Sequence, residues 1–228
     1  MNIYAIGDLH LPGNDQKPME VFGEQWKGHW EKIKANWIHS VGPNDAVLIP
    51  GDISWAMRFE DALDDIQEIG KLSGYKVLMR GNHDYWWSAI TRLRESLPEG
   101  MYALQNDHVD LGAYVIAGTR GWACPPGLSA NDEKIYLREA SRLELSLRSA
   151  YQAANGREII VMMHYPPFND KQAPSAFTDL IDGYGIQYVV YAHLHGDSLK
   201  NAFEGRIRQT EYMLVSCDYL GFNLKKVI

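Results

Sequence analysis

Five short apolar runs are spread along the chain, and each has the length of a buried β-strand. They cover residues 3–6, 46–49, 77–79, 159–163 and 188–192. Between the first of these runs lie stretches with the apolar spacing of helices, which we expect over residues 16–40, 61–71 and 85–97. Strands that alternate with helices predict a parallel sheet built from βαβ units.

The rest of the chain has a different pattern. Turn residues separate short apolar stretches that we interpret as antiparallel strands, namely residues 103–104, 108–111 and 114–117. The longest helical pattern covers residues 131–154 behind a capping sequence at Ser129, and another helix is expected around residues 175–184. An antiparallel finish is predicted from residues 201–206, 211–216 and 222–227. With no credible linker, we predict one α/β domain spanning residues 1–228.

Composition narrows the class of protein. Of 228 residues, 46% are hydrophobic and 22% are charged, which is ample for a packed core. The net charge of −7 argues against long nucleic acid as a partner. It allows a small phosphorylated substrate, which could be a nucleotide, because bound cations would reverse the local sign.

The compartment is predicted from what the chain lacks. We see no signal-peptide pattern and no apolar stretch long enough to span a bilayer. Cys124 and Cys217 are far apart and form no CxxC pair, so we expect free thiols. These features predict a cytoplasmic protein without a membrane partner. They do not predict its oligomeric state.

Polar clusters follow all five predicted strands. Their side chains are those of Asp8, His10, Asp52, Asn82, His83, Asp84, His164, His193 and His195. In extended chain, residues two apart point to the same side, so Asp8 with His10, and His193 with His195, can each hold one site. Five of the eight histidines lie in these clusters. The other three, His29, His39 and His108, are expected to be structural.

The candidate metal ligands number too many for one ion that also leaves room for substrate. They are Asp8, His10, Asp52, Asn82, His164, His193 and His195. If one carboxylate bridges, the set divides into two groups of four and predicts two adjacent metals. Oxygens mixed with imidazoles, without thiolates, suit divalent or trivalent Mn, Fe, Co or Zn. An oxygen-only Ca²⁺ or Mg²⁺ cage is disfavoured by the histidines.

The ordered motifs resemble the calcineurin-like metallophosphoesterase superfamily. They are Asp-Leu-His at 8–10, Gly-Asp at 51–52, Gly-Asn-His-Asp at 81–84, His164, and His-Leu-His at 193–195. The resemblance implies a four-layer αββα sandwich of two mixed β-sheets flanked by helices, with a dinuclear metal site at the carboxyl ends of the strands. The chain departs from the family pattern at two places: Ala192 stands where glycine is usual, and no second acid follows Asp52.

The resemblance also implies a ligand for each position. Asp8, His10, Asp52 and His195 would hold one metal. Asn82, His164 and His193 would hold the other, with Asp52 as the bridge. The second departure could alter the groups that orient Asp52, and the first could crowd the backbone near the site.

Two metals of this kind predict hydrolysis of phosphoesters. They would share a bridging hydroxide that attacks phosphorus in line, and their charge would stabilise the transition state. The leaving oxygen needs a proton, and we predict His83 as the general acid, held and charged by Asp84. The resemblance implies the same role for His83. Capping of a helix at Tyr85 is the alternative reading of His83 and Asp84.

Substrate contacts are predicted less sharply. Arg120 lies in a loop after a strand, where its guanidinium could bind phosphate or form an ordinary ion pair. The first part of residues 125–154, from Pro125 to the start of the long helix, could form a partial lid over the metal ligands. Aromatic residues beside the clusters could stack on a base, although core packing is favoured for Trp86, Trp87, Trp122 and Tyr165. The tryptophans of residues 16–40 are likewise read as a packing face rather than a ligand platform.

The leading hypothesis is therefore a metal-dependent phosphomonoesterase or phosphodiesterase. One alternative is a catalytically weak scaffold of the same fold that acts in protein assembly, although the complete ligand set argues against it. Another is metal-assisted hydrolysis of amides or lactones. Release of phosphate from a test ester separates these hypotheses.

Overall fold

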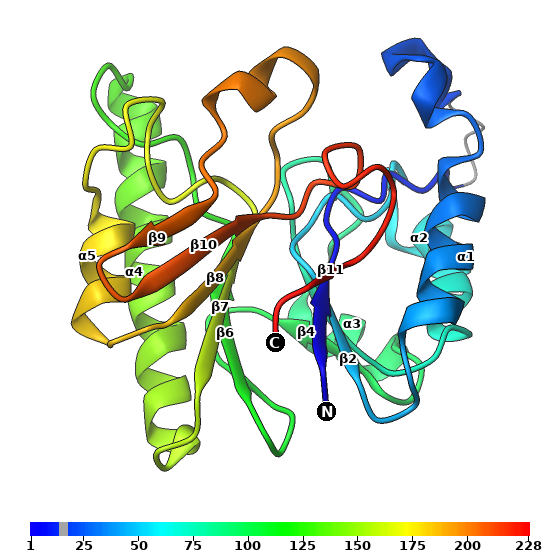
Figure 1. The fold of residues 1–228 in the computed structure, drawn as a ribbon, viewed down its shortest axis with the longest axis horizontal. Helices are drawn as coiled ribbons and strands as arrows, with labels where there is room; N and C mark the ends of the chain where they lie inside the picture. Colours follow the sequence, from blue (N-terminus) through cyan, green and yellow to red (C-terminus); the bar gives the residue numbers. More distant parts are fainter. Residues whose placement is uncertain (14–17) are drawn as a thin grey trace.

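Two mixed β-sheets pack face to face in the computed structural model, which describes residues 1–13 and 18–228 (Figure 1). The first sheet has the order β11-β1-β2-β3-β4, in which β1 to β4 are parallel and β11 is antiparallel. Its strands are β1 (Ile3–Ala5), β2 (Ala46–Ile49), β3 (Tyr75–Met79), β4 (Met101–Leu104) and β11 (Lys225–Lys226). Parallel pairing places the carboxyl ends of β1, β2 and β3 at one edge.

The second sheet has the order β5-β6-β7-β8-β10-β9. Strands β6, β7, β8 and β10 are parallel, and the two edge strands are antiparallel to their neighbours. The strands are β5 (Val109–Asp110), β6 (Val115–Thr119), β7 (Ile159–Met163), β8 (Tyr188–Tyr191), β9 (Gly205–Ile207) and β10 (Thr210–Leu214). Their carboxyl ends lie at the same end of the molecule as those of the first sheet.

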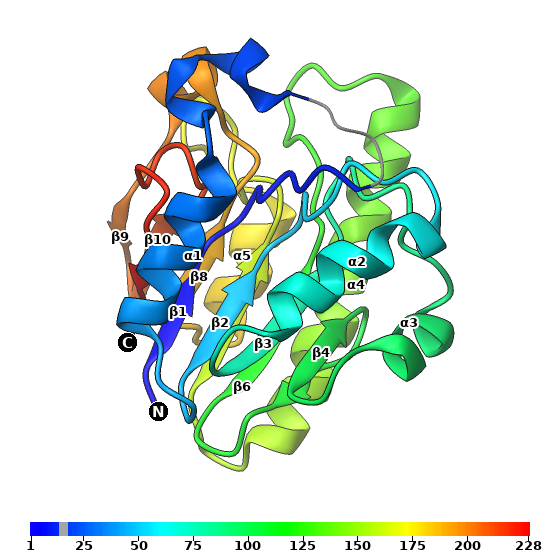
Figure 2. The ribbon, with the colours of Figure 1, turned by 90° about the vertical axis from the view of Figure 1, so that its right-hand side faces the viewer.

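Helices cover the outer face of each sheet and complete the four layers (Figure 2). The first sheet is covered by α1 (His29–Ser40), α2 (Phe59–Gly70) and α3 (Ile90–Ser96). The second sheet is covered by α4 (Ala130–Ala154) and α5 (Ala176–Gly183). Three short 3₁₀ helices lie at the carboxyl end of the strands: η1 (Met19–Phe22), η2 (Glu24–Trp26) and η3 (Gly196–Asn201). The predicted fold is confirmed.

Successive side chains of a strand point to opposite faces of its sheet, and in this protein both faces are covered, one by the other sheet and one by helices. In β1, Ile3 and Ala5 face the core between the sheets, whereas Tyr4 packs toward the helices. In β7, Ile160 and Met162 face the same central core. Continuous apolar runs are therefore required here, and these runs made the strands visible in the sequence.

Two predicted helices are shorter in the structure. Residues 18–28 of the predicted 16–40 helix form η1, η2 and turns instead, because Gly23 and Gly28 adopt φ of 129° and 60°. Residues 16 and 17 lie outside the described residues. The predicted helix over residues 85–97 begins only at Ile90, because the backbone of Ala89 is extended, with φ of −55° and ψ of 132°.

The predicted antiparallel strands are confirmed in part: β5 pairs with β6, β9 with β10 and β11 with β1 in antiparallel fashion, but other pairings of these strands are parallel. β4 is parallel to β3 in the first sheet, whereas β6 is parallel to β7 in the second, so the chain crosses between sheets here. In this middle part of the chain, β5 and β6 form the expected antiparallel pair. At the end of the chain, β9 and β10 are antiparallel, but β10 is parallel to β8 and β11 returns to the first sheet. Turn residues alone do not reveal a crossover.

Candidate metal centre

The two sheets are joined at the edge where the polar clusters lie. Gly7 follows β1 and donates its N–H to the carbonyl of Val215, at 2.7 Å, after β10. The N–H of Cys217 donates to the Gly7 carbonyl at 3.1 Å. These bonds bring the loops of the first sheet against those of the second. Ligands from both sheets can therefore converge.

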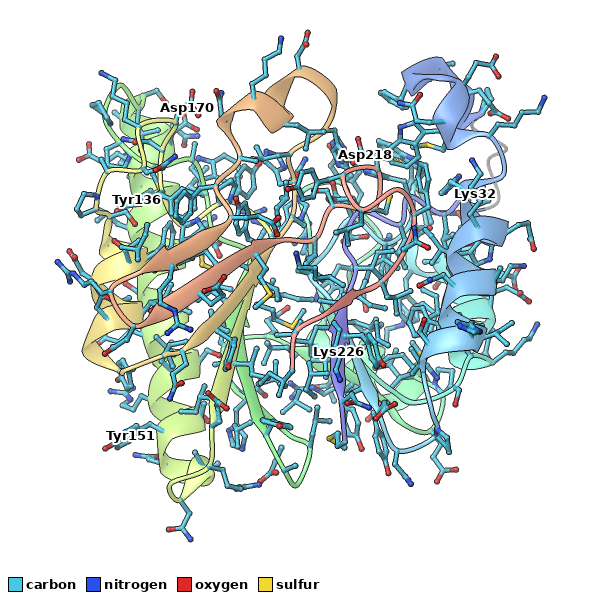
Figure 3. The ribbon with its side chains drawn as sticks, in the orientation of Figure 1. Lys32, Tyr136, Tyr151, Asp170, Asp218 and Lys226 are labelled. Carbon is cyan, nitrogen blue, oxygen red and sulfur yellow. The ribbon has the colours of Figure 1, made fainter. Side chains whose placement is uncertain are left out.

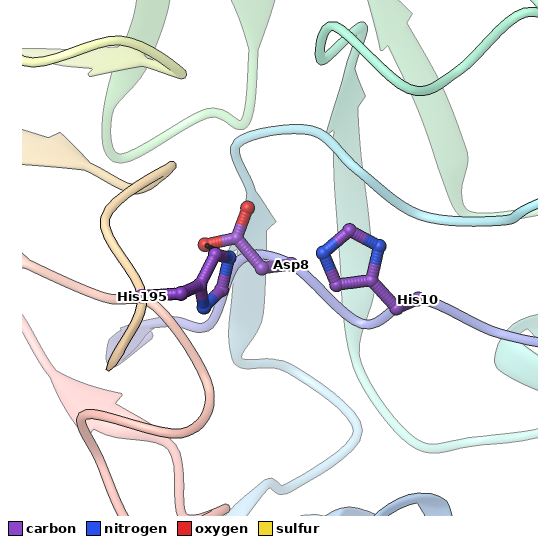
Figure 4. A group of neighbouring side chains, drawn as sticks. All are labelled: Asp8, His10 and His195. Carbon is purple, nitrogen blue, oxygen red and sulfur yellow. Dashed lines mark ion pairs between the residues drawn. The ribbon is translucent and has the colours of Figure 1, made fainter. Parts of the chain in front are cut away.

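Asp8, His10 and His195 form the first cluster (Figure 4). One donor atom from each residue lies within 4.8 Å of the others. Oδ2 of Asp8 is 3.3 Å from Nε2 of His195, and Nε2 of His10 is 3.9 Å from Oδ2 of Asp52. The structure thus brings together all four side chains predicted for the first metal.

His164 is the centre of the second cluster. Its Nε2 lies 2.7 Å from Oδ1 of Asn82, 3.2 Å from Nδ1 of His193 and 3.6 Å from Oδ2 of Asp52. Its Nδ1 is 2.9 Å from the carbonyl of Pro50, which fixes Nδ1 as the protonated nitrogen and leaves a lone pair on Nε2. The other three side chains predicted for the second metal, those of Asp52, Asn82 and His193, surround this lone pair.

Asp52 is better placed than Asp8 to bridge two ions. Both carboxylates approach both clusters, and Asp8, Asp52 and His164 form a second convergent group. However, Asp8 approaches His164 at Nδ1, 3.8 Å away, and that nitrogen already bonds to Pro50. Asp52 instead faces Nε2. The geometry supports Asp52 as the shared ligand.

The donor set fits metal ions of the predicted kind. Asp8 Oδ1 is buried without a hydrogen-bond partner in the described structure, and the neighbouring Nε2 of His195, also buried, has none beyond its ion pair with Asp8 at 3.3 Å. Buried polar atoms normally find a partner, so such orphans clustered in one place point to a missing ligand. Carboxylate oxygen, amide oxygen and imidazole nitrogen are the donors that Mn, Fe, Co and Zn share.

Four of the predicted ligands have a backbone that L-amino acids rarely adopt. The φ angles are 58° at Asp8, 46° at His10, 51° at Asp52 and 76° at His193. Each such residue costs about 1–3 kcal/mol, and strain of this kind gathers at functional sites. Backbone bonds hold it in place, because His10 N–H donates to the Asp52 carbonyl and His193 N–H donates to Asp8 Oδ2.

The glycines of the motifs permit close approach of the loops. A Cβ at Gly81 would lie 2.1 Å from Oδ1 of Asp52. A Cβ at Gly51 would lie 2.6 Å from Gly81 and 2.9 Å from Nδ1 of His164. Glycine precedes Asp52 and Asn82 because any side chain would push these ligands apart.

The departure at Ala192 is accommodated by the opposite strand. Ala192 is fully buried, and a Cβ at Gly7 would lie 2.6 Å from its methyl group. Gly7 therefore provides the space that the alanine occupies. The expected crowding is taken up between the sheets, and the donor atoms still converge.

Asp84 binds backbone groups of both ligand loops. Its carboxylate accepts hydrogen bonds from the N–H groups of Asp52, Ile53, Ser54 and Gly81 and from the indole of Trp86. Burial, and next the neighbouring carboxylate of Asp52, raise the pKa of Asp84 to about 6. We predicted that Asp84 would hold His83. That role stays a prediction, and the hydrogen bonds of Asp84 show in addition that it connects the loops carrying Asp52 and Asn82.

His83 lies beside the ligands with its ring toward the cavity above them. Its backbone N–H donates to Oδ1 of Asp52 at 2.8 Å, and its ring centroid is 6.0 Å from that of His10 and 4.8 Å from that of Trp55. It also lines the cavity together with His193 and His195. This position suits a proton donor to a bound substrate.

Asp218 is a functional candidate that sequence reasoning missed. It lies on the loop after β10, between the two sheets (Figure 3), and its Oδ1 is 2.8 Å from Nδ1 of His195. A carboxylate behind a metal-binding imidazole commonly orients the ring. The only signal in the sequence is an acid that follows a strand.

Electrostatics at the centre follow from burial and mutual contact. Burial opposes protonation of His195, but Asp8 and Asp218 outweigh it and raise its pKa to about 10. Burial, and then Asp8, raise the pKa of Asp52 to about 8. Burial lowers the pKa of both His10 and His193 to about 3, so these rings are neutral and able to bind a cation.

Arg120 lies in a different pocket from the ligands. Its Nη2 is 3.5 Å from Oε1 of buried Glu139, and its guanidinium stacks over Trp122 at 4.8 Å. The pocket also contains Arg80 and Arg142. The ion-pair alternative for Arg120 is therefore present, although Nε of Arg120 has no hydrogen-bond partner among the described residues.

The aromatic residues divide into two groups. Trp86 and Trp87 are core residues whose indoles donate to Asp84 and Gln105. Tyr165 stacks against His193 with centroids 3.9 Å apart, and Trp122 packs on Tyr165.

The cavity over the ligands is not covered by the segment that we considered as a lid. Within the described residues, none of residues 125–154 lines it, and residues 130–154 form α4 on the outer face of the second sheet. Met19, Phe22 and Trp26 line it instead, from η1 and η2. Trp26 is therefore both a buried residue and a wall of the site.

The fold and site together define a class: a two-sheet α/β protein with a histidine–aspartate metal centre at the strand ends. A family model described as calcineurin-like phosphoesterase matches residues 1–197. The chain belongs to this family. Membership supports a hydrolase of the phosphoesterase type that acts on a small phosphorylated substrate and uses divalent metal ions.

Solved structures agree with this fold at low identity. The phosphopantetheinyl hydrolase PptH from Mycobacterium tuberculosis superposes with a TM-score of 0.56 and 13% identity, over 100% of this chain and 95% of that one. AQ665 from Aquifex aeolicus, a protein of unknown function, gives 0.52 and 14%, over 99% and 95%. No curated protein matches the sequence. Within the described residues, no helix is long and apolar enough to cross a membrane.

Proposed function

We propose that this protein hydrolyses phosphoesters with a dinuclear metal centre held by both sheets. The observation that carries the proposal is that one imidazole from each predicted donor group approaches the same atom, Oδ2 of Asp52: Nε2 of His10 at 3.9 Å and Nε2 of His164 at 3.6 Å. One group contains Asp8, His10 and His195, and the other contains Asn82, His164 and His193. Because neither sheet supplies a complete group, residues 1–228 would act as one domain.

The protein supplies position and protons, whereas bound metal supplies charge. When bound, two Mn, Fe, Zn or Co ions would make hydroxide available near neutral pH and neutralise the phosphoryl oxygens. His83 would donate a proton to the leaving oxygen, since its ring faces the same cavity as the ligands. Asp84 would act through the loops, keeping Asp52 and Asn82 in place.

Arg120 remains a candidate for binding phosphate, and two further arginines lie in its pocket. Arg80 and Arg142 line the same pocket, and Glu139 is the only acid there among the described lining residues. Nε of Arg80 and of Arg120 are buried without partners, which favours an anion in this pocket. We expect Arg120→Gln to raise the KM for an anionic substrate while kcat changes less.

We also propose a compartment and a class of substrate. Two buried free thiols, Cys124 and Cys217, support a reducing cytoplasm. The substrate would be a small monoester or diester, and the panel to be tested includes nucleotides and 4′-phosphopantetheine esters. A scaffold without activity is disfavoured because the chain carries every predicted donor and His83.

The test is turnover of two model esters by the Mn²⁺-loaded protein. We expect hydrolysis of p-nitrophenyl phosphate or its bis ester, release of inorganic phosphate from the monoester, and loss of at least about 100-fold in kcat for His83→Ala with metal content unchanged. His39→Ala is the matched control, because His39 lies outside the site on α1. Full activity in both His83→Ala and Asp52→Asn would overturn the proposal.

A further inference from the structure

A cavity of about 260 Å³ lies directly over the metal ligands. One side of it is formed by His10, Asp52, His193 and His195. The other side comes mainly from η1 and η2, with Trp55 from the loop after β2, and its larger side chains are Met19, Phe22, Gln25, Trp26 and Trp55. The cavity therefore has a polar floor and a wall that the metal chemistry does not require.

Apart from Gln25, whose amide donates to the Phe22 carbonyl, the side chains of this wall are apolar or aromatic and packed against one another. The ring of Trp55 stacks on His10 with centroids 4.7 Å apart and planes 16° apart, and its indole N–H points to the sulfur of Met19 at 3.2 Å. Trp26 is 3% exposed and packs 5.9 Å from His195. The indole donor of Trp55 is thus engaged by Met19 on the same wall, which leaves carbon as the surface that this ring offers a ligand.

Phe22 extends the wall to the mouth of the cavity. It is 59% exposed although it is a large apolar side chain, and its ring centroid lies 6.4 Å from that of Trp26. Burying such a ring gains free energy only when something apolar covers it. A ligand that reaches from the metal centre to Phe22 would do so.

Charge points to the same kind of ligand. Among the described residues that line the cavity there is no lysine or arginine, and the acids are Asp52 and Asp218. A phosphoryl group would be neutralised by metal, but a second anionic group beside the wall would meet no cation among the described lining residues. The part of the substrate that lies against this wall should therefore be uncharged.

We propose that Met19, Phe22, Trp26 and Trp55 form a subsite for an uncharged alkyl or aryl group of the ester. His83 lies on the same side, 4.8 Å from Trp55, so the group held there is the one that leaves. This inference rests on the proposed function and names its substrate class. Nucleoside diphosphates and triphosphates are poor fits to this wall.

The subsite is tested by direct binding of alkylphosphonates, which resemble the ester but are not hydrolysed. Calorimetry on the Mn²⁺-loaded protein would compare methyl-, butyl- and hexylphosphonate. We expect the Kd to fall about three- to fourfold for each methylene that enters the subsite. A Kd that is independent of chain length, in a protein that hydrolyses p-nitrophenyl phosphate, would overturn the subsite alone. If methylphosphonate does not bind and no ester is hydrolysed, the proposed function fails instead.

Phe22→Ala tests whether the dependence on chain length arises at Phe22. Because this side chain is exposed, we expect its removal to change the stability of the fold little. We expect hexylphosphonate to bind about fivefold or more weakly, with methylphosphonate unchanged, and Phe22→Leu to recover most of the loss. Tyr151→Ala is the matched control, an exposed aromatic at the far end of α4 (Figure 3). An unchanged chain-length dependence in Phe22→Ala, or an equal loss in Tyr151→Ala, would contradict the assignment.

Discussion

The two sheets contribute to the metal centre in different ways. Ligands from the first sheet include both carboxylates and the amide, and their loops are bound to one another through the backbone. His10 N–H donates to the Asp52 carbonyl at 2.9 Å, and Asp8 N–H donates to the Gly51 carbonyl at 3.0 Å. The second sheet provides imidazoles alone, His164, His193 and His195. Two of them are oriented through Nδ1, by the Pro50 carbonyl and by Asp218.

This difference predicts that substitutions near the two sets of ligands have different effects on folding and on metal binding. Oxygen ligands sit on short loops whose positions depend on a backbone network, so changes there should affect folding as well as metal. Imidazole ligands are oriented by single side-chain bonds, so changes behind them should affect metal affinity with little cost in stability. Substitutions outside the ligand set can separate the two.

The largest effect is expected from Asp84→Ala. Removal of its carboxylate leaves four backbone N–H groups and the Trp86 indole without their acceptor in a buried place. We expect the free energy of unfolding to fall by about 3–5 kcal/mol, measured by urea denaturation with metal removed. Asp64→Ala, at an exposed position on α2, is the control. Wild-type stability in Asp84→Ala would show that the network is unimportant.

The contact between the sheets gives the next largest effect. Gly7→Ala would place a methyl group 2.6 Å from that of Ala192, and we expect a loss of about 1–3 kcal/mol in stability. Adding Ala192→Gly should restore most of it, while Ala192→Gly alone should change little. Strictly additive losses in the double variant would contradict the proposed steric contact.

Behind the imidazoles, Asp218→Asn should affect metal rather than folding. Asparagine keeps the size of the side chain but removes the charge that faces Nδ1 of His195. We expect metal affinity to fall about 10–100-fold, measured by competition with a chromogenic chelator, with a nearly unchanged melting temperature. Asp197→Asn is the matched control, since Asp197 pairs with Lys200 on the surface. Equal losses in both variants would remove the role of Asp218.

The smallest effect is the dependence of metal binding on pH. His195 and Asp52 have raised pKa values, about 10 and about 8, so in the metal-free protein both hold protons above the pH at which the free side chains lose them. A metal must displace these protons. Apparent affinity should therefore rise from pH 7 toward pH 9, and calorimetry in two buffers should show proton release at pH 7. Affinity that is flat or falls over this range would contradict the assignment.

Much of this arrangement was predictable because strand ends and ligands coincide. The predicted strands at residues 46–49 and 159–163 match β2 and β7, since buried parallel strands require continuous apolar runs. Motif order then indicated which polar residues would meet. The donor atoms of Asp8, His10 and Asp52 do approach those of His164 and His195.

What could not be predicted depends on partners distant in sequence. Asp218 meets His195 only because β10 is parallel to β8, a pairing that no local pattern reveals. The role of Asp84 is set by backbone groups about thirty residues away. The η1 and η2 turns were read as helix because the apolar spacing continues through Gly23 and Gly28.

Metal stoichiometry tests the central proposal most directly. Elemental analysis of the protein loaded with Mn²⁺ and then desalted should give two ions per chain in the wild type. Because Asp52 would be shared, Asp52→Asn should retain at most one, whereas Asp197→Asn should retain both. One ion or fewer in the wild type, or two retained in Asp52→Asn, would contradict a dinuclear centre joined by this carboxylate.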